Sequence, residues 1–190
     1  MFTELESLSQ RIATFRENVL LPAVTPARTP LVVGAAACGD AVRYEQALAL
    51  DYTLVQTGFR FGPVWSTCWF RLSGRIPDDW PNVALRFDCG TEALLWNDGV
   101  PYHGLGPNHD TVRLGVEPGD EVQMHIEAAC NRPLGATLFW WDEREALARW
   151  NEDEPGRLDR CELVSIDETM WQLSETMDFA RRVMLIDDTP

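Results

Sequence analysis

Residues 112–126, VRLGVEPGDEVQMHI, establish the pattern of the middle of the chain. Every second side chain is apolar on both sides of Pro118-Gly119-Asp120. The side chains of a β-strand point alternately to its two faces, and a Pro-Gly-Asp run is typical of a turn. The stretch therefore predicts two strands joined by a turn, each with an apolar face and a wet face. His125 falls on the wet face, where we expect a solvated side chain.

The same period of two extends over residues 50 to 128. Val83, Leu85 and Phe87 alternate with polar or small residues, and Asp98-Gly99 is a strong hairpin signal between two further runs. About seven or eight short strands follow one another at roughly ten-residue spacing, with no intervening helical pattern that would indicate a parallel sheet. The sequence predicts a mainly β fold, an antiparallel sandwich of two sheets.

Helical patterns lie on both sides of the predicted strands. The first twenty residues place apolar side chains at spacings of three and four, and Pro22, Pro26 and Pro30 should end this helix. The residues of its stripe are Phe2, Leu5, Leu8, Ile12, Phe15 and Val19. A second stripe, with Asp167 placed to cap its helix, consists of Ile166, Met170, Leu173, Met177, Ala180 and Met184. We expect three segments: helix and proline-rich connection (1–30), sandwich (31–141), and acidic loop with C-terminal helix (142–190).

Composition narrows the classes of function. The chain has 190 residues and a formal net charge of −14, which counts against nucleic acid or an anionic membrane as partner. No apolar run is long enough to span a membrane, and the acidic start lacks the basic region of a signal peptide. Five cysteines without a C-x-x-C pair favour free thiols in a reducing compartment, so we expect a cytoplasmic domain.

Motifs that would indicate catalysis are missing from the sequence. His103, His109 and His125 lack the spacing of zinc ligands, and no nucleophile elbow or phosphate-binding loop is present. Cys130 is expected to be a buried thiol. A pair of carboxylates, as glycoside hydrolysis requires, leaves no signature in sequence spacing. The acids near predicted strand ends and turns are Asp88, Glu92, Asp98 and Glu127. We predict no catalytic residue, metal site or cofactor in this chain.

Eight tryptophans are the unusual feature of the composition. Exposed tryptophans can stack on sugar rings, whereas buried ones fill cores and interfaces. The core explanation places Trp65 and Trp69 between the two sheets. Trp140 and Trp141 are adjacent, so on a strand only one of them can face the core. Both explanations remain open at this stage.

Several ordered motifs resemble a known family. Residues 62–70, GPVWSTCWF, are similar to a W-G-P-x-W-S-T-x-W-F signature in the N-terminal domain of glycoside hydrolase family 38 α-mannosidases. Residues 88–101, DCGTEALLWNDGVP, and residues 126–131, IEAACN, continue the resemblance. The two flanking helices also fall where the family has them. The chain departs from the family at Phe61, commonly a tryptophan, and in the short segment that follows Leu105.

The resemblance implies a jelly-roll or galactose-binding-like sandwich placed before a catalytic domain. In that family the zinc ligands and the aspartate nucleophile lie in the downstream domain, which hydrolyses α-mannosidic bonds with retention of configuration. No motif of that domain occurs here, and we expect the sequence to stop before it. The implied role is therefore non-catalytic support of the catalytic domain of the same polypeptide, within carbohydrate metabolism.

Two other functions stay open. Sandwiches of this type often bind sugars in loops at one end, and a mannose-containing glycan would then be bound by Trp96, Asp98, His103 and Asn131. Alternatively, the chain is a stand-alone interaction domain whose two helices form the seam of a homo-oligomer.

Overall fold

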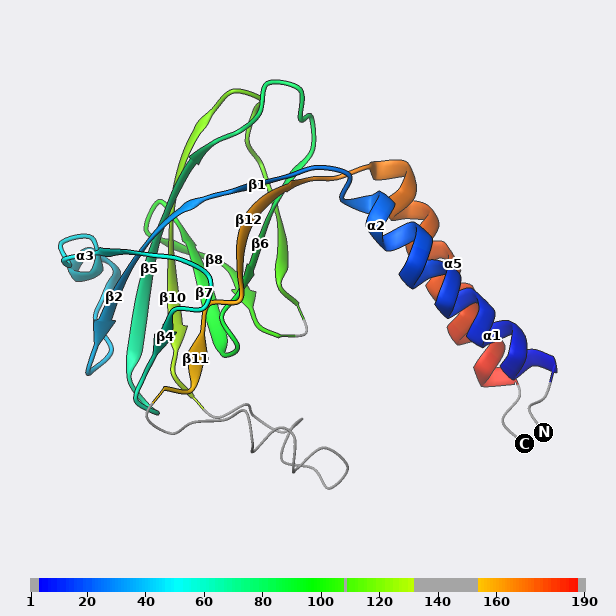
Figure 1. Cartoon of the computed structure of the whole chain (residues 1–190), viewed down its shortest axis with the longest axis horizontal. Coiled ribbons are helices and arrows are strands. Elements are labelled where there is room, and N and C mark those ends of the chain that lie inside the picture. The colour runs from blue at the N-terminus through cyan, green and yellow to red at the C-terminus, as the bar shows by residue number, and fades with distance from the viewer. Residues whose placement is uncertain (1–3, 108, 132–153, 188–190) are drawn as a thin grey trace.

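The computed structural model describes residues 4–107, 109–131 and 154–187. Two antiparallel sheets face each other, and a pair of helices extends away from them (Figure 1). The four-stranded sheet has the order β1 (Arg28–Pro30), β12 (Arg160–Ser165), β6 (Val83–Asp88), β9 (Thr111–Leu114). The six-stranded sheet has the order β3 (Thr53–Val55), β2 (Val32–Cys38), β5 (Thr67–Arg75), β10 (Glu121–Ala129), β7 (Glu92–Asn97), β8 (Val100–Leu105). The predicted sandwich with helices at both ends is confirmed.

The stretch 112–126 crosses from one sheet to the other. Strands β9 and β10 both form as predicted, but β9 pairs with β6 whereas β10 pairs with β5 and β7. Backbone hydrogen bonds fix the intervening turn to the end of β5, since Ile76 N–H donates to the Asp120 carbonyl at 2.8 Å and Gly119 N–H to the Ile76 carbonyl at 3.0 Å. Gly119 has a φ of 87°, which glycine adopts without strain.

The turn at Asp98-Gly99 is the predicted hairpin turn. It joins β7 and β8, which pair with each other, and its two residues have φ values of 48° and 81°. Positive φ at both central residues matches the twist of the flanking strands, and Asp-Gly tolerates it. This hairpin forms one edge of the six-stranded sheet.

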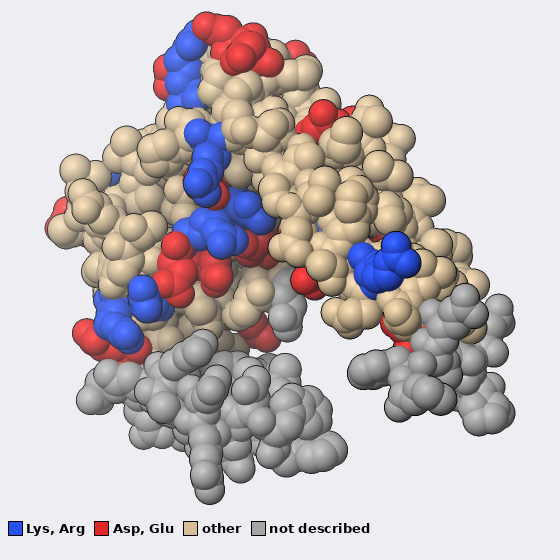
Figure 2. All heavy atoms as spheres, turned by 45° about the vertical axis from the view of Figure 1, so that its right-hand side comes forward, with Lys and Arg blue, Asp and Glu red and all other residues tan. Residues whose placement is uncertain are grey.

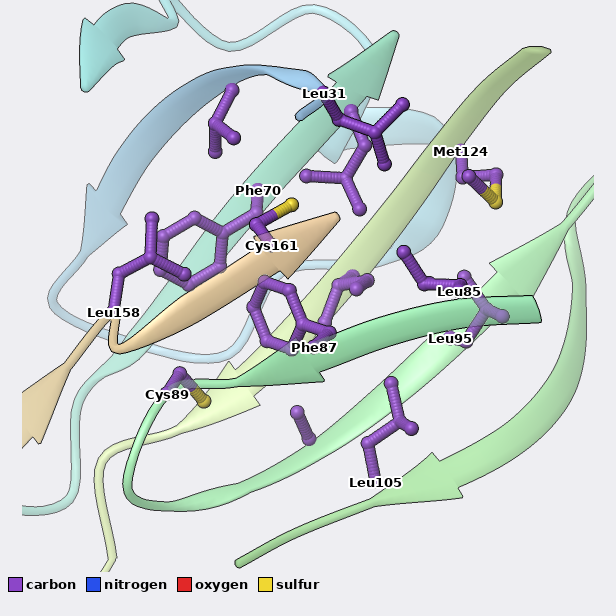
Figure 3. Packing of buried hydrophobic residues seen from close by; sticks show 14 of the residues in the cluster. Leu31, Phe70, Leu85, Phe87, Cys89, Leu95, Leu105, Met124, Leu158 and Cys161 are labelled. Carbon is purple, nitrogen blue, oxygen red and sulfur yellow. The ribbon is translucent and has the colours of Figure 1, made fainter. Parts of the chain in front are cut away.

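The core lies between the sheets and is filled by side chains from both (Figure 3). The Phe70 ring of β5 meets the Phe87 ring of β6 at 5.4 Å between centroids and the Phe61 ring at 5.3 Å. Leu85 and Leu95 approach the same space from opposite sheets and are almost completely buried. Burying one such side chain contributes roughly 1.5–3 kcal/mol, so this layer is the main source of stability.

A two-stranded ladder of β4 (Arg60–Phe61) and β11 (Gly156–Arg157) adds to the sandwich at one end. Residues 150–160 are polar and were expected to form a loop, yet their described part holds β11 and the start of β12. The backbone explains the difference, because Arg157 N–H and Leu158 N–H donate to the carbonyls of Cys89 and Phe59 at 2.9 Å each. The expected domain boundary at 141–142 lies outside the described residues, as do Trp140 and Trp141.

The helix pair joins the two ends of the described chain. Helix α1 (Glu4–Phe15) continues through a π-helical turn, Arg16–Leu20, into α2 (Leu21–Val24), and this arm packs along α5 (Glu168–Asp187). Pro22 does not end the helix as predicted, because it sits in the first turn of α2, where a missing N–H breaks no bond. Asp167 caps α5 as predicted, accepting the Met170 N–H at 2.9 Å.

Candidate functional site

The outer face of the six-stranded sheet carries a cluster of aromatic and titratable side chains. Trp69 of β5 lies opposite Glu127 of β10, and His125 of β10 lies opposite Trp96 of β7. Cross-strand partners share one face, and the neighbouring residues in sequence point to the core. We call Trp69, Trp96, His125 and Glu127 the outer cluster.

The connection between β2 and β3 covers the outer cluster. Its short helix α3 (Tyr44–Ala47) places the Tyr44 ring parallel to the Trp96 ring at 5.2 Å between centroids. The same ring meets Trp69 at 6.2 Å and His125 at 5.7 Å, both edge-on. His125 is consequently only 6% exposed, so the expected solvated histidine is wrong. The period of two assigns a side chain to a face but does not show which connection covers that face.

Tyr52 extends this cover toward β2. The Arg71 guanidinium lies 4.6 Å from the centre of its ring, and its hydroxyl donates to the Ala47 carbonyl at 3.0 Å. A Cβ at Gly34 would meet the Tyr52 Cβ at 3.0 Å, so a glycine at this position of β2 allows the tyrosine to approach. Sequence reasoning missed both tyrosines. The available signal was Gly34 itself, since glycine inside a strand often marks a close approach.

The titratable groups of the outer cluster respond to burial. Burial raises the pKa of Glu127, and a hydrogen bond from Trp96 Nε1 to its Oε2 at 3.3 Å acts in the opposite direction. Burial, with the charge of Arg71 as the second cause, lowers the pKa of His125 below its ordinary value. Trp69 Nε1 is buried without a hydrogen-bond partner among the described residues. Near neutral pH the cluster therefore holds an uncharged imidazole.

The four carboxylates that the sequence suggested as a catalytic pair either accept hydrogen bonds from other groups of the chain or lie far from one another. Glu92 and Glu127 lie on one face of adjacent strands as diagonal neighbours, but Glu92 accepts the Asn131 amide at 2.9 Å and Glu127 accepts the Trp96 indole. Asp88 belongs to the other sheet and accepts the Gly90 N–H at 2.9 Å. Asp98 sits in the β7–β8 turn.

The four residues expected to bind sugar occupy different places. Trp96 and Asp98 lie at the hairpin end of β7, and His103 is exposed on the edge strand β8. Asn131 donates a hydrogen bond to Glu92. Glu92 lies four residues before Trp96 along β7, which corresponds to about 13 Å between these two residues. The structure thus brings Trp96 and Asp98 to one end of the sheet and places Asn131 at the other.

Trp65 differs from the core tryptophan that we expected. Its side chain is 75% exposed, and its φ of 70° is rare for a bulky residue. Hydrogen bonds hold it there, because Trp65 N–H donates to the Cys130 carbonyl at 2.7 Å and the Ser66 hydroxyl to the Pro63 carbonyl at 2.6 Å. Trp69 is fully buried, but under Tyr44 on the outer face rather than between the sheets.

Comparison with models of known protein families identifies the family of this domain. A family model described as "Alpha-mannosidase, jelly roll domain", of the Ams1-like type, matches residues 29–164. The chain belongs to this family. The match begins in β1 and ends in β12, so it covers both sheets of the jelly roll and leaves the helix pair outside.

Relatives of the jelly roll domain carry the same enzyme name. The chain is 38% identical over 101 residues to alpha-mannosidase 2C1 of Homo sapiens, across 49% of this chain and 10% of that protein. It is 28% identical over 105 residues to alpha-mannosidase G of Dictyostelium discoideum, across 50% of this chain and 10% of that protein. The matched region thus spans about a tenth of the length of each relative.

The described residues contain few groups with the character of metal ligands or reactive thiols. Within residues 4–107, 109–131 and 154–187, no group of three histidine, cysteine or acidic side chains is arranged to do so. All five cysteines are free, and burial raises the pKa of Cys130, a buried thiol as predicted. In the same described residues no helix combines the length and apolarity needed to cross a membrane.

Proposed function

We propose that this chain is the non-catalytic N-terminal domain of a family 38 α-mannosidase, and that it supports a catalytic domain that hydrolyses α-mannosidic bonds with retention. The observation that carries the proposal is the family match over both sheets of the jelly roll. The proposed partner is the downstream catalytic domain of the same polypeptide. We place this assembly in the cytoplasm, a proposal that the five free cysteines support.

The outer cluster supports a structural role. Its open side is filled by Tyr44 and Tyr52 of the same chain, and its carboxylate Glu127 is bonded to Trp96. A glycosidase needs two carboxylates on either side of a bound sugar. The arrangement of the outer cluster is that of a packed face, which suits a domain that supports chemistry elsewhere.

Zinc enters the proposal only through the catalytic domain. His103 is exposed on an edge strand, and His125 is enclosed by Tyr44 and Tyr52. Zinc in such enzymes is held by three protein ligands that converge on one point. The donors within the described residues do not converge, so that part of the chain does not fit a zinc ion.

Enzyme assays test the proposal. The purified chain, supplied with zinc, is expected to show no hydrolysis of 4-nitrophenyl α-mannoside. Human alpha-mannosidase 2C1 from which the whole N-terminal region equivalent to this chain has been deleted, called truncated 2C1 below, is expected to bind the chain and to unfold at a higher temperature in its presence. Circular dichroism verifies beforehand that truncated 2C1 is folded. Turnover by the chain alone would contradict the non-catalytic role, and absence of binding would contradict the supporting role.

A second candidate function is carbohydrate binding, which the exposure of Trp65 favours. The backbone of this tryptophan is fixed next to Cys130, one residue from Asn131, so an aromatic face and an amide lie at the same end of the sandwich. Indole faces stack on apolar sugar faces. Calorimetric titration with mannose and short α-mannosides should then give heat that Trp65→Ala abolishes and His103→Ala leaves unchanged. No heat at millimolar sugar would exclude this function.

A further inference from the structure

The contact between the two arms of the helix pair is partly polar, although Leu20 and Val24 of the N-terminal arm are also buried. Ser9 of α1 and Ser174 and Asp178 of α5 are buried between the helices. Arg16 Nε donates to Ser174 Oγ at 3.0 Å, and the Arg16 guanidinium also reaches Glu175 at 3.4 Å. Amphipathic helices that stabilise only each other would bury their apolar stripes in this contact.

The predicted apolar stripes lie elsewhere. On α1, the stripe of Leu5, Leu8, Ile12 and Phe15 is displaced by about a fifth of a turn from the buried Ser9 and the half-buried Arg16, since each residue advances the helix by about 100°. Val19 of the π-helical turn continues the stripe. Phe15 is 44% exposed and Val19 is 49% exposed. The stripe on the N-terminal arm is therefore largely exposed, although Ile12 is half-buried, and on α5 Met177 is half-buried whereas Leu173 is exposed.

Both stripes border one open groove. Its volume is about 1160 Å³, and its apolar lining comes from Leu8, Ile12 and Phe15 of α1, from Val19 of the π-helical turn and from Met177 of α5. Met177 belongs to the stripe of α5 that also contains Leu173 and Met184. A groove between two helices with anchors at spacings of three and four is the kind of surface that receives an amphipathic helix.

The helix pair carries ion pairs, such as Arg182 with Asp178 at 2.7 Å, and the charged residues that also line the groove are Glu6, Arg11 and Arg181. The outer face of the four-stranded sheet is covered by ion pairs, such as Arg160 with Asp110 at 2.7 Å and Arg113 with Glu168 at 2.7 Å. Figure 2 shows basic and acidic side chains together on the sandwich and few of them on the visible side of the helix pair. The apolar side chains of the groove are therefore bordered by polar and charged ones, and an exposed apolar patch with a polar rim is typical of an interaction site.

We propose that the groove between α1 and α5 is the docking site for an apolar helix face of the α-mannosidase catalytic domain. Because α5 follows directly on β12, a polypeptide of this family that continues beyond the jelly roll runs through α5. The matched region is only 10% of each curated relative, so most of an α-mannosidase lies outside it. Figure 1 shows α1 and α5 side by side, extending away from the sandwich. The inference rests on the proposed function, which it locates on the molecule.

Binding to truncated 2C1 tests the docking site. The chain is immobilised, and its dissociation constant for truncated 2C1 is measured for three forms: wild type, Phe15→Glu and Phe179→Glu. Phe15 lines the groove, whereas Phe179 is 70% exposed on α5 and does not line it. We expect Phe15→Glu to weaken binding roughly tenfold or more, because a charge would enter an apolar contact, and Phe179→Glu to bind as the wild type does.

The possible outcomes separate the two proposals. Equal binding by the wild type and by Phe15→Glu would overturn the docking site and leave the supporting function intact. No binding by the wild type would remove both. Sedimentation of the chain alone supplies a further outcome: a dimer that Phe15→Glu dissociates would show that a second copy occupies the groove, and the docking site would again be overturned. Circular dichroism of each variant verifies that the helices are retained.

Discussion

Replacing Gly156 by alanine is expected to destabilise the jelly roll by about 1–3 kcal/mol, the usual cost of overfilling a packed site. A Cβ at this position of β11 would collide with the Phe61 ring on β4. That ring is 3% exposed and lies 6.2 Å from the Phe59 ring and 5.3 Å from the Phe70 ring. Phe61 therefore cannot turn aside without displacing core side chains. The strain would fall on the β4–β11 ladder.

Urea unfolding followed by tryptophan fluorescence measures this effect. Gly104→Ala is the matched control, because Gly104 also lies in a strand, β8, but an added Cβ there meets no atom within 4 Å. The control is expected to keep its stability or to gain up to about 1 kcal/mol from reduced freedom of the unfolded chain. In the double variant Gly156→Ala/Phe61→Leu the smaller side chain should relieve part of the collision, so the two losses should not add.

A free energy of unfolding for Gly156→Ala within roughly 0.5 kcal/mol of the wild-type value, the usual range for surface substitutions, would contradict the predicted collision. Full additivity of the two losses in the double variant would contradict it as well, since residues in contact should show coupling.

Three further predictions concern individual side chains. Because the folded pKa of His125 is lowered, the unfolded chain binds the proton more readily, so stability should fall as pH drops below about 6.5. His125→Gln should flatten this part of a pH–stability curve, and His103→Gln should not. Asp167→Ala removes the cap of α5 and should cost about 0.5–2 kcal/mol, measured by thermal unfolding. Burial raises the pKa of the thiols, so a disulfide reagent should modify the native chain slowly, and first at Cys38, which is partly exposed whereas the other four cysteines are buried.

The sequence predicted the strands better than their partners. Alternation identified β6, β9 and β10, and Asp98-Gly99 identified the β7–β8 hairpin. It could not show that β9 and β10 belong to different sheets, because turn residues specify a reversal of direction and not a hydrogen-bonded neighbour. Likewise β11 escaped detection, since its pairing depends on backbone groups of a distant segment.

For the candidate site, the limits have a similar cause. Trp96 and Glu127 were singled out from the sequence, and they do meet on one face of the sheet. Tyr44, which packs over them, lies in the connection between β2 and β3. This connection has no hydrophobic periodicity, so no sequence pattern predicted the contact. The stripe on α1 was identified correctly, but which side of a helix meets its neighbour is decided by packing over the whole molecule. Here Ser9 and Arg16 occupy that contact.

The position of β12 has a consequence for how the chain folds during its synthesis. This strand lies between β1 and β6, so the first and the last strands of the jelly roll are neighbours in the four-stranded sheet. While a ribosome is still producing the residues before Arg160, β1 has no partner strand and β6 has an unpaired edge, although most of the six-stranded sheet is already available. Such long-range pairing slows folding and prolongs the exposure of strand edges. We therefore expect a nascent chain stalled before Arg160 to depend on chaperones, and that dependence should end once Ser165 has left the exit tunnel.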